Sequence, residues 1–301
     1  MKTYILVAND PGVGGLVEQA ATWGQPVVAV VVGSKDLTQV AACPGVDEVI
    51  WLGDPGNHGI EAFASSVAAI VADDPGVVLA GRRPSERVFL GTVAASIMAP
   101  IITGVQSVSF NNETVVIKHG IYGGIAVATT QFEGPIAMQI DGGAPVVGGG
   151  TAVIETRSAT PTTITVTSLT PPEVASVDLD TASRVVGVGR GLKRSEDLGL
   201  VEALATRLNA EIGCSRPLSE GLDWLPRDRY IGVSGAHIAP DLYIMIGISG
   251  QLQHVSGCRA SKVIVSINND KDALVTQDSD YILTGDLYAL VPALSAALEK
   301  S

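Results

Sequence analysis

Polar side chains suited to binding a ligand are concentrated in one stretch near the carboxyl end of the chain. Ser249 lies in a glycine turn after the apolar run 242–246, and Gln253 and His254 follow in a short polar segment. A second apolar run ends at Asn268. In an α/β sheet, ligands bind beyond the carboxyl ends of the strands, where loop backbone and helix N-termini are exposed. Two neighbouring strands are therefore expected to deliver polar groups to one crevice.

Further polar groups in this part of the chain lie in loops that follow expected strands or helices. Arg190, in the glycine turn 187–191, is a permanent cation whose planar donor fork suits phosphate. Ser215 and Arg216 follow an expected helix, and Ser234 lies in another glycine-containing loop. For each residue alone a simpler interpretation stays open, because an arginine beside glycines is often a solvated turn residue.

Two of the candidates have clear structural alternatives. Asp286 precedes the last expected helix, where an aspartate is a common N-cap that needs no ligand. His254 lies beside a glutamine and near a glycine turn, so a core histidine and a ligand-binding histidine are equally open interpretations. The whole set of polar groups at strand ends, rather than any member, favours a binding site.

Other kinds of chemistry have little support in the sequence. Cys43, Cys214 and Cys258 show no CxxC spacing, so neither a disulfide framework nor a zinc or iron–sulfur site is predicted. No serine lies in a nucleophile-elbow sequence, which disfavours covalent hydrolysis. The turn 12–16 has the glycines of a dinucleotide-binding loop, but Val17 replaces the third glycine, so a plain loop is favoured.

Composition narrows the class of protein. A chain of 301 residues is long enough for two domains with their own cores. The net charge of -12 argues against binding to nucleic acid. Although 46% of the residues are apolar, no run approaches the roughly 18 needed to span a bilayer, and no basic leader precedes the first strand. We therefore expect a soluble cytoplasmic protein without membrane insertion.

The first half of the chain alternates expected strands and helices, which predicts a parallel sheet. Ser85 is the expected cap of the second of two helices in this region. Between residues 105 and 167 the helical pattern disappears, and β-type segments suggest a meander that extends the sheet. The expected strands are 4–8, 27–32, 48–52 and 77–80, followed by meander strands at 105–110, 115–119, 125–130, 136–140, 152–155 and 163–166, with helices at 60–71 and 85–97.

A Thr/Pro-rich stretch from 159 to 172 and the polar residues after it indicate a linker. The expected domains are 1–182 and 183–301. The second has strands at 184–187, 242–246, 264–268 and 281–283, a helix that begins at 195 and ends at Gly213 as its C-cap, and a final helix over 286–298. The predicted fold class is α/β, with two Rossmann-like three-layer domains, each a mostly parallel sheet flanked by helices.

Six short motifs in one order give the C-terminal half a specific resemblance. The chain resembles the α subunit of electron transfer flavoproteins, and more loosely so over 83–105 and 122–127 of the N-terminal half. The motifs are Gly189-Arg-Gly-Leu192, Cys214-Ser-Arg216, Gly247-Ile-Ser-Gly250, Gln253-His254, Ser266-Ile-Asn268 and Gly285-Asp286-Leu287.

The resemblance implies that the C-terminal domain holds FAD and that the N-terminal domain packs on a β subunit. Arg190 and Ser215 would then lie by the pyrophosphate and ribityl chain, and Asn268 and Asp286 would hold the adenosine half. Arg216, Ser234 and His254 would face the isoalloxazine ring. The full set of cofactor-binding residues that it implies is Arg190, Ser215, Arg216, Val233, Ser234, Ser249, Gly250, Gln253, His254, Asn268, Asp286 and Leu287.

The residue types fit such a role. A group that donates a hydrogen bond to the N1/C2-carbonyl edge of the flavin stabilises negative charge there, and His254 is the residue expected to do so. Arg216 adds a charge that cannot be titrated away and should raise the flavin potential. Because the cofactor performs the electron chemistry, no catalytic residue and no metal is expected.

Some departures from the commonest family pattern point to one branch. The chain has Gly232-Val-Ser-Gly235 where many members have Gly-Gln-Thr-Gly, and Ile267-Asn-Asn-Asp270 where many have Ile-Asn-Lys-Asp. The first change, with Cys214-Ser-Arg-Pro217 and Trp224, resembles the Fix-type branch associated with anaerobic carnitine and related acyl-CoA metabolism.

Three functional hypotheses follow. The leading one is the FAD-binding α subunit of a heterodimer that shuttles electrons between acyl-CoA dehydrogenase-type flavoenzymes and a reductase or quinone-linked partner. A second is the α subunit of a bifurcating complex that oxidises NADH, with another FAD in the β subunit. A third, from a different class, is an enzyme that uses a nucleotide cofactor in the same crevice.

Overall fold

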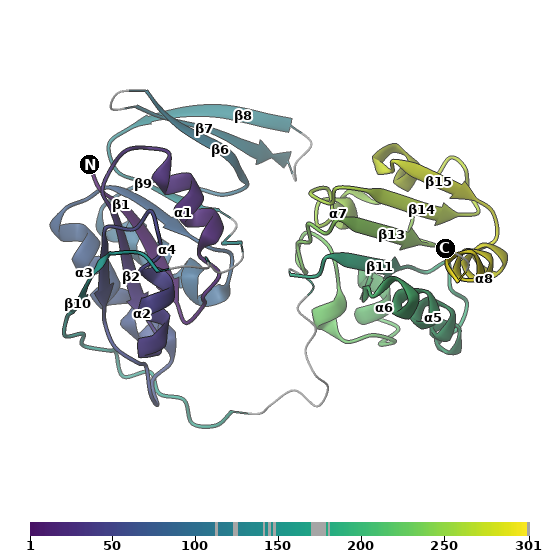
Figure 1. Ribbon diagram of the computed structural model, residues 1–301, viewed down its shortest axis with the longest axis horizontal. Coiled ribbons are helices and arrows are strands. Elements are labelled where there is room, and N and C mark those ends of the chain that lie inside the picture. Colours follow the sequence, from purple (N-terminus) through teal and green to yellow (C-terminus); the bar gives the residue numbers. More distant parts are fainter. Residues whose placement is uncertain are drawn as a thin grey trace. The chain divides into compact units, whose positions relative to one another are not determined.

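The computed structural model describes residues 1–111, 114–122, 126–140, 142–143, 146, 149–169, 179 and 181–299. The chain divides into two compact units, Met1–Thr170 and Pro171–Ser301 (Figure 1). The sequence prediction placed the division after residue 182, and much of the expected linker, at 170–178 and 180, lies outside the described residues.

The first unit is built on a seven-stranded parallel sheet with the strand order β10-β3-β2-β1-β4-β9-β5. Its central strands are fully buried, which explains their continuous β-branched sequences. The strands are β1 (Thr3–Ala8), β2 (Val27–Val32), β3 (Glu48–Trp51), β4 (Val77–Ala80), β5 (Ile101–Ile102), β9 (Ile136–Gln139) and β10 (Val153–Thr156).

Helices cover both faces of this sheet. One core contains the apolar faces of α3 (Ala64–Asp73) and α4 (Pro84–Ser96), and the other contains those of α1 (Gly14–Ala21) and α2 (Lys35–Ala41). A 3-10 turn, η1 (Ile60–Phe63), precedes α3. The glycine turn before α1 packs on backbone, because a Cβ at Gly12 would lie 2.7 Å from the carbonyl oxygen of Gly143.

The predicted meander needs a correction in its pairing. Strands β6 (Val105–Asn111), β7 (Thr114–Ile121) and β8 (Ala126–Glu133) form a separate three-stranded antiparallel sheet, whereas β9 and β10 return to the parallel sheet. Strand β9 is inserted between β4 and β5, where Ile136, Ala137 and Met138 are buried. The expected strand 163–166 is not formed, and Thr165 makes only an isolated bridge to His58.

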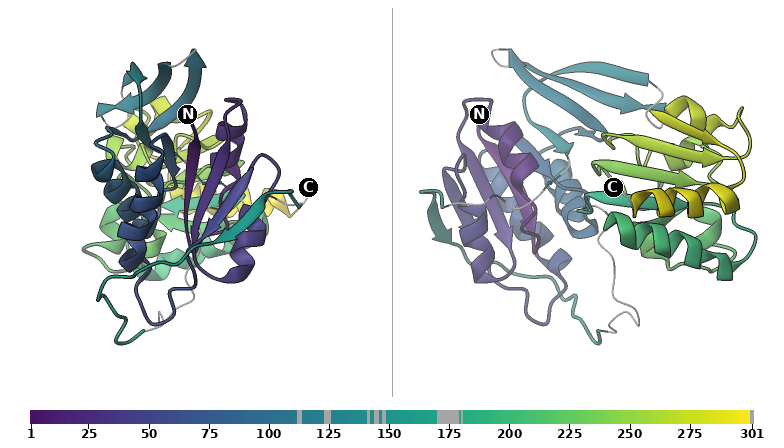
Figure 2. Two further views of the ribbon diagram at one scale, coloured as in Figure 1. Left: turned by 90° about the vertical axis from the view of Figure 1, so that its left-hand side faces the viewer. Right: turned by 45° about the vertical axis from the view of Figure 1, so that its right-hand side comes forward.

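The second unit has a five-stranded parallel sheet with the order β12-β11-β13-β14-β15. Figure 2 shows α8 beside α5, and the two helices share one core with the sheet. The strands are β11 (Arg184–Val188), β12 (Glu211–Cys214), β13 (Leu242–Ile246), β14 (Ile264–Asn268) and β15 (Tyr281–Thr284), and the helices are α5 (Leu198–Leu208), α6 (Arg216–Ser219), α7 (Leu252–Val255) and α8 (Leu287–Leu298), with 3-10 turns η3 (Ser195–Asp197), η4 (Arg227–Arg229) and η5 (Leu274–Asp278).

Two predicted helix caps are wrong. Helix α5 ends at Leu208 because Asn209 adopts the left-handed conformation, with φ of 47°, that asparagine tolerates better than most residues. Gly213 lies instead in β12, where a Cβ would approach the Cδ1 atom of Ile231 to 2.3 Å. At α4 the N-cap is Arg83 rather than Ser85, whose hydroxyl donates to Glu61.

The predicted fold class is confirmed, since both units are sheets with mostly parallel strands and flanking helices. Within the residues that the structure describes, no helix combines the length and apolar character needed to cross a membrane. Because the second unit has a parallel sheet, the carboxyl ends of its strands form the kind of sheet edge where ligands bind in α/β folds.

Candidate functional site

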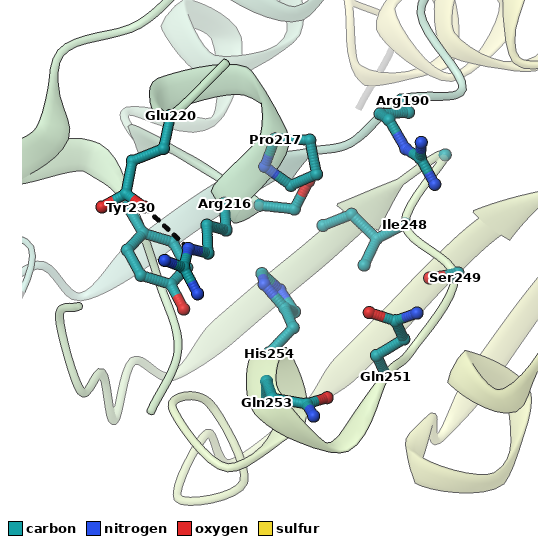
Figure 3. Close-up of a pocket in the computed structure, with 12 residues that line it drawn as sticks. Arg190, Arg216, Pro217, Glu220, Tyr230, Ile248, Ser249, Gln251, Gln253 and His254 are labelled. Atoms are coloured by element: carbon teal, nitrogen blue, oxygen red, sulfur yellow. Dashed lines mark hydrogen bonds and ion pairs between the residues drawn. The ribbon is translucent and has the colours of Figure 1, made fainter. Parts of the chain in front are cut away.

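A cavity of about 460 Å³ lies in the second unit (Figure 3). Its walls come from segments that follow three adjacent parallel strands: the turn after β11, the start of α6 after β12, and the loop after β13 that leads into α7. The lining residues are Arg190, Ser215, Arg216, Pro217, Glu220, Tyr230, Gly247, Ile248, Ser249, Gln251, Gln253 and His254.

Half of the residues predicted for the site lie in this cavity. The structure brings together Arg190, Ser215, Arg216, Ser249, Gln253 and His254. They come from separate loops, and their meeting follows from the parallel strand order, which places the carboxyl ends of β12, β11 and β13 side by side. The other predicted residues are not among those that line it, and they are Val233, Ser234, Gly250, Asn268, Asp286 and Leu287.

Asn268 and Gly250 shape the loop that carries Ser249. The side-chain amide of Asn268 donates to the carbonyl of Ile248 at 2.9 Å. Gly250 has φ of 81°, and a Cβ there would lie 2.0 Å from the backbone nitrogen of Val275, which donates to the carbonyl of Ser249. Only glycine fits this close approach, so both residues determine where the loop lies.

The four remaining residues that were predicted for the site contact other parts of the second unit. Asp286 is the N-cap of α8, because its carboxylate accepts from the backbone nitrogen of Tyr288 at 3.0 Å. Leu287 is buried in the core beneath that helix. Val233 and Ser234 are exposed, and the backbone nitrogen of Val233 donates to the carbonyl of Gln253 at 2.7 Å. That bond ties the exposed loop to α7.

Tight glycine packing holds two walls of the cavity together. A Cβ at Gly191 would lie 2.5 Å from the Cα of Gly247, and a Cβ at Gly189 would lie 2.5 Å from the carbonyl oxygen of Gly247. The turn after β11 and the loop after β13 are therefore in backbone contact. This contact fixes Arg190 relative to Ser249.

Glu220 is a lining residue that the sequence reasoning missed. Its Oε2 atom lies 2.7 Å from the Nε of Arg216, and its Oε1 lies 3.4 Å from the Nε of Arg227. The hydrogen bond from Arg216 lowers the pKa of Glu220, so the carboxylate is ionised near neutral pH. The spacing of four residues between Arg216, which begins α6, and Glu220, which follows its end, was a usable signal.

Arg190 differs from Arg216 in its partners. Within the described part of the chain, no hydrogen bond or ion pair involves the guanidinium of Arg190. Figure 3 shows Arg190 on the turn after β11 and Arg216 at the start of α6, with Glu220 beside Arg216 only. A free, fork-shaped cation beside serine hydroxyls suits an anionic group such as a phosphate.

His254 lies in the cavity wall but is 6% exposed. Its Nε2 atom is 2.8 Å from the hydroxyl of Tyr243, while Nδ1 has no hydrogen bond of acceptable geometry to any described residue. Burial lowers the pKa of His254 to about 4, and a hydrogen bond with the backbone of Ile231 raises it to a smaller extent. The imidazole is therefore neutral near pH 7.

The cavity offers several groups that can bind a ligand. The cavity combines cations, hydroxyls, amides and one neutral imidazole. Cys43, Cys214 and Cys258 are free and buried, and burial raises the pKa of each thiol. The described residues contain no cluster of three or more side chains that could hold a metal ion.

Both halves of the chain match described families. Residues 178–259 match the family described as "Electron transfer flavoprotein FAD-binding domain", and residues 11–169 match the one described as "Electron transfer flavoprotein domain". The first match contains the cavity residues from Arg190 to His254.

Whole-length relatives agree with these matches. YdiR of Escherichia coli (strain K12), which is named as an electron transfer flavoprotein subunit, is 36% identical over 93% of this chain and 93% of its own. The protein FixB of Salmonella typhimurium is 31% identical over 95% of this chain and 94% of its own. FixB of Escherichia coli O157:H7 is 34% identical over 82% of each chain.

Proposed function

We propose that this chain carries electrons, because it belongs to the electron transfer flavoprotein family as an α-type subunit with an FAD-binding domain. The proposed role is to shuttle electrons between acyl-CoA dehydrogenase-type flavoenzymes and a reductase or quinone-linked partner. The α subunits of this family pair with β subunits, so we propose that the working form is a heterodimer.

The cavity of the second unit fits FAD chemically. FAD carries a pyrophosphate, a hydroxylated ribityl chain and a flavin ring, and it supplies the one- and two-electron chemistry when bound. The guanidinium of Arg190, which has no ion pair among the described residues, suits the pyrophosphate, and the hydroxyls of Ser215 and Ser249 suit the ribityl chain. The Nδ1 atom of His254, buried and without a hydrogen bond of acceptable geometry to any described residue, suits a polar edge of the ring.

The single observation that best supports FAD binding in this cavity is the buried Nδ1 atom of His254, which lacks a hydrogen bond of acceptable geometry to any described residue. A buried polar atom without a partner costs free energy, on the order of 1–3 kcal/mol. Of the six side chains with such an atom among the described residues, His254 is the one that lines the cavity. His254 belongs to the wall of the cavity that the FAD-binding domain match contains. We propose that a flavin ring edge satisfies it.

The residues around the ring site would set its electrostatics. A neutral His254 would donate or accept a hydrogen bond without adding a net charge. Arg216 would add a positive field, and Glu220 would reduce it, because the two side chains are paired at 2.7 Å. We propose that this balance tunes the reduction potential of the bound flavin.

The other predicted residues keep supporting roles in the proposal. Asn268 and Gly250 would hold the loop of Ser249 in place. The exposed loop of Val233 and Ser234, which is hydrogen-bonded to Gln253, would contribute to the ring site. We propose that the first unit makes the β-subunit contact. It presents exposed apolar side chains that suit such a surface, namely Val88, Met98 and Ile101.

Co-expression with a β-type partner tests the proposed function. The purified complex should show the visible spectrum of a bound flavin and should be reduced by an acyl-CoA dehydrogenase with its substrate. A complex that stays colourless after FAD is added would overturn the proposal. The flavin count is a second result: one FAD in the α subunit fits simple carriage, and two flavins per heterodimer would favour the bifurcating alternative.

A further inference from the structure

A buried contact links the wall of the cavity to the interior of the second unit. The hydroxyl of Tyr243 lies 2.8 Å from the Nε2 atom of His254, and the two rings are stacked with an interplanar angle of 28°. Tyr243 lies on the central strand β13 and is fully buried, whereas His254 lies on α7 in the cavity wall. The contact therefore connects a rigid strand to a residue that faces a ligand site.

The backbone leaves a fitted space for the hydroxyl of Tyr243. Gly187 lies on β11, the strand that pairs with β13, and a Cβ on it would come to 2.1 Å from that oxygen. Any other residue at position 187 would displace the tyrosine ring. The hydroxyl is thus held by two neighbouring strands in the core, and its position does not depend on the loops of the cavity.

Both partners are uncharged near neutral pH. Burial raises the pKa of Tyr243 well above its ordinary value and lowers the pKa of His254 to about 4. A neutral imidazole has one N–H group and one nitrogen lone pair. The hydrogen bond to Tyr243 therefore decides which nitrogen carries the proton, as hydrogen bonds to histidine generally do.

The direction of this hydrogen bond follows from the available partners. Within the described residues, the Nε2 atom of His254 is the one hydrogen-bond partner of the Tyr243 hydroxyl. If Nε2 carried the proton, the buried phenol hydrogen would have no acceptor, at a cost on the order of 1–3 kcal/mol, whereas a proton on the other ring nitrogen is supported by the backbone of Ile231, whose hydrogen bond raises the pKa of His254. The favoured arrangement has Tyr243 donating to Nε2, which places the proton of His254 on Nδ1.

We infer that Tyr243 is a positioning residue that holds His254 as the Nδ1–H tautomer, so that this neutral histidine presents a hydrogen-bond donor to the ligand of the cavity. The nature of the acceptor rests on the proposed function, in which it is an edge of the flavin ring. A fixed donor stabilises negative charge on that edge without a proton exchange between His254 and solvent.

The tautomer can be measured in the full-length chain labelled with 15N-histidine. The chain has 4 histidines, and His254→Gln assigns the signal of interest. The 15N spectrum near pH 7 should show His254 with a protonated Nδ1 and an unprotonated Nε2. Tyr243→Phe, which removes only the hydroxyl, should convert this single form into a mixture or into the Nε2–H form.

Tyr288→Phe is the matched control, because the hydroxyl of Tyr288 also has two hydrogen bonds, one donated to the carboxylate of Asp197 and one accepted from the backbone nitrogen of Lys193, but Tyr288 does not line the cavity. It should leave the signal of His254 unchanged. A wild-type spectrum with the proton on Nε2, or a Tyr243→Phe spectrum identical to the wild type, would overturn the inference. If Tyr243→Phe does not fold, the wild-type tautomer alone decides the matter.

The FAD-loaded complex gives a second readout. In Tyr243→Phe the reduced form of FAD should bind roughly tenfold less tightly relative to the oxidised form, seen as a lowered reduction potential. An unchanged potential in a variant that has lost the Nδ1–H tautomer would overturn the ligand-facing role. Failure of the proposed function is distinguishable, because a chain that takes up no FAD still reports the tautomer of His254.

Discussion

Arg216 and Glu220 form a hydrogen-bonded ion pair in the wall of the cavity, with 2.7 Å between the Nε and Oε2 atoms. Arg190, the other arginine of the cavity, has no such partner among the described residues. The two arginines therefore differ in electrostatic environment: the positive field of Arg216 is partly offset by a carboxylate, whereas that of Arg190 is not.

Glu220→Gln should raise the reduction potential of bound FAD. The change removes the negative charge beside Arg216 and leaves a side chain of similar size, so a more positive field would act on the reduced flavin. Redox titration of the complex measures the effect. Glu202→Gln, on the exposed face of α5, removes the same charge away from the cavity and should leave the potential unchanged. A fall in potential for Glu220→Gln would contradict the expected sign.

Gly250→Ala should destabilise the second unit and weaken FAD binding together. The added Cβ would lie 2.0 Å from the nitrogen of Val275, and the backbone there has a φ of 81° that disfavours alanine. We expect a loss of roughly 2 kcal/mol or more in urea unfolding. Gly199→Ala, in α5 with open space around its Cβ, should instead be neutral or stabilising by up to about 1 kcal/mol. Equal stabilities of the two variants would speak against this packing.

Glu86→Gln should change how stability depends on pH. Burial, with help from Asp10, raises the pKa of Glu86 from 4.5 to about 7, while Arg83 acts in the opposite direction. The folded state therefore binds more protons than the unfolded state between these values, and this group makes stability fall as pH rises through that window.

Urea unfolding of the full chain at pH 4.5 and at pH 8 measures this effect. Relative to the wild type, Glu86→Gln should gain on the order of 2 kcal/mol at pH 8 compared with pH 4.5. Glutamine keeps an oxygen that can accept from the backbone nitrogen of Arg83, so the start of α4 should be preserved. An equal difference between variant and wild type at both pH values would show that Glu86 titrates normally.

Asp286 has two expected roles that substitutions can separate. Asp286→Ala removes the N-cap of α8 and should cost about 1 kcal/mol of stability. Asp286→Asn keeps a capping oxygen and removes the charge, so its stability should stay near that of the wild type. A loss of FAD affinity in Asp286→Asn is expected from the proposed contact with the adenosine half of FAD, and unchanged affinity would leave capping as its one role.

The sequence was most informative where local chemistry decides the structure. The continuous β-branched runs predicted buried parallel strands such as β2, and polar residues after β11, β12 and β13 predicted a shared crevice. These arguments succeed because the burial of a strand is encoded in its own residues, and because strands that alternate with helices form a parallel sheet whose carboxyl ends lie at one edge. The cavity residues Arg190 and His254 were found in this way.

The sequence was less informative where distant segments decide. Nothing local shows that β9 enters the sheet between β4 and β5, or that Gly213 lies in a strand against Ile231. The Tyr243–His254 contact also depends on the pairing of β11 with β13, since Gly187 provides the space for the hydroxyl. These strand pairings and side-chain contacts depend on tertiary packing between distant segments. The pattern of residue types within one segment does not predict them.

Titration of the FAD-free complex with FAD tests the central claim most directly, with Arg190→Gln beside the wild type. Flavin fluorescence should show saturable binding by the wild type, and Arg190→Gln should bind about 10-fold or more weakly, because a charge-assisted contact to the pyrophosphate is lost. Arg207→Gln removes the same charge from the exposed face of α5 and should bind FAD like the wild type. Absence of saturable binding, or equal affinities for the wild type and Arg190→Gln, would contradict the assignment of this cavity to FAD.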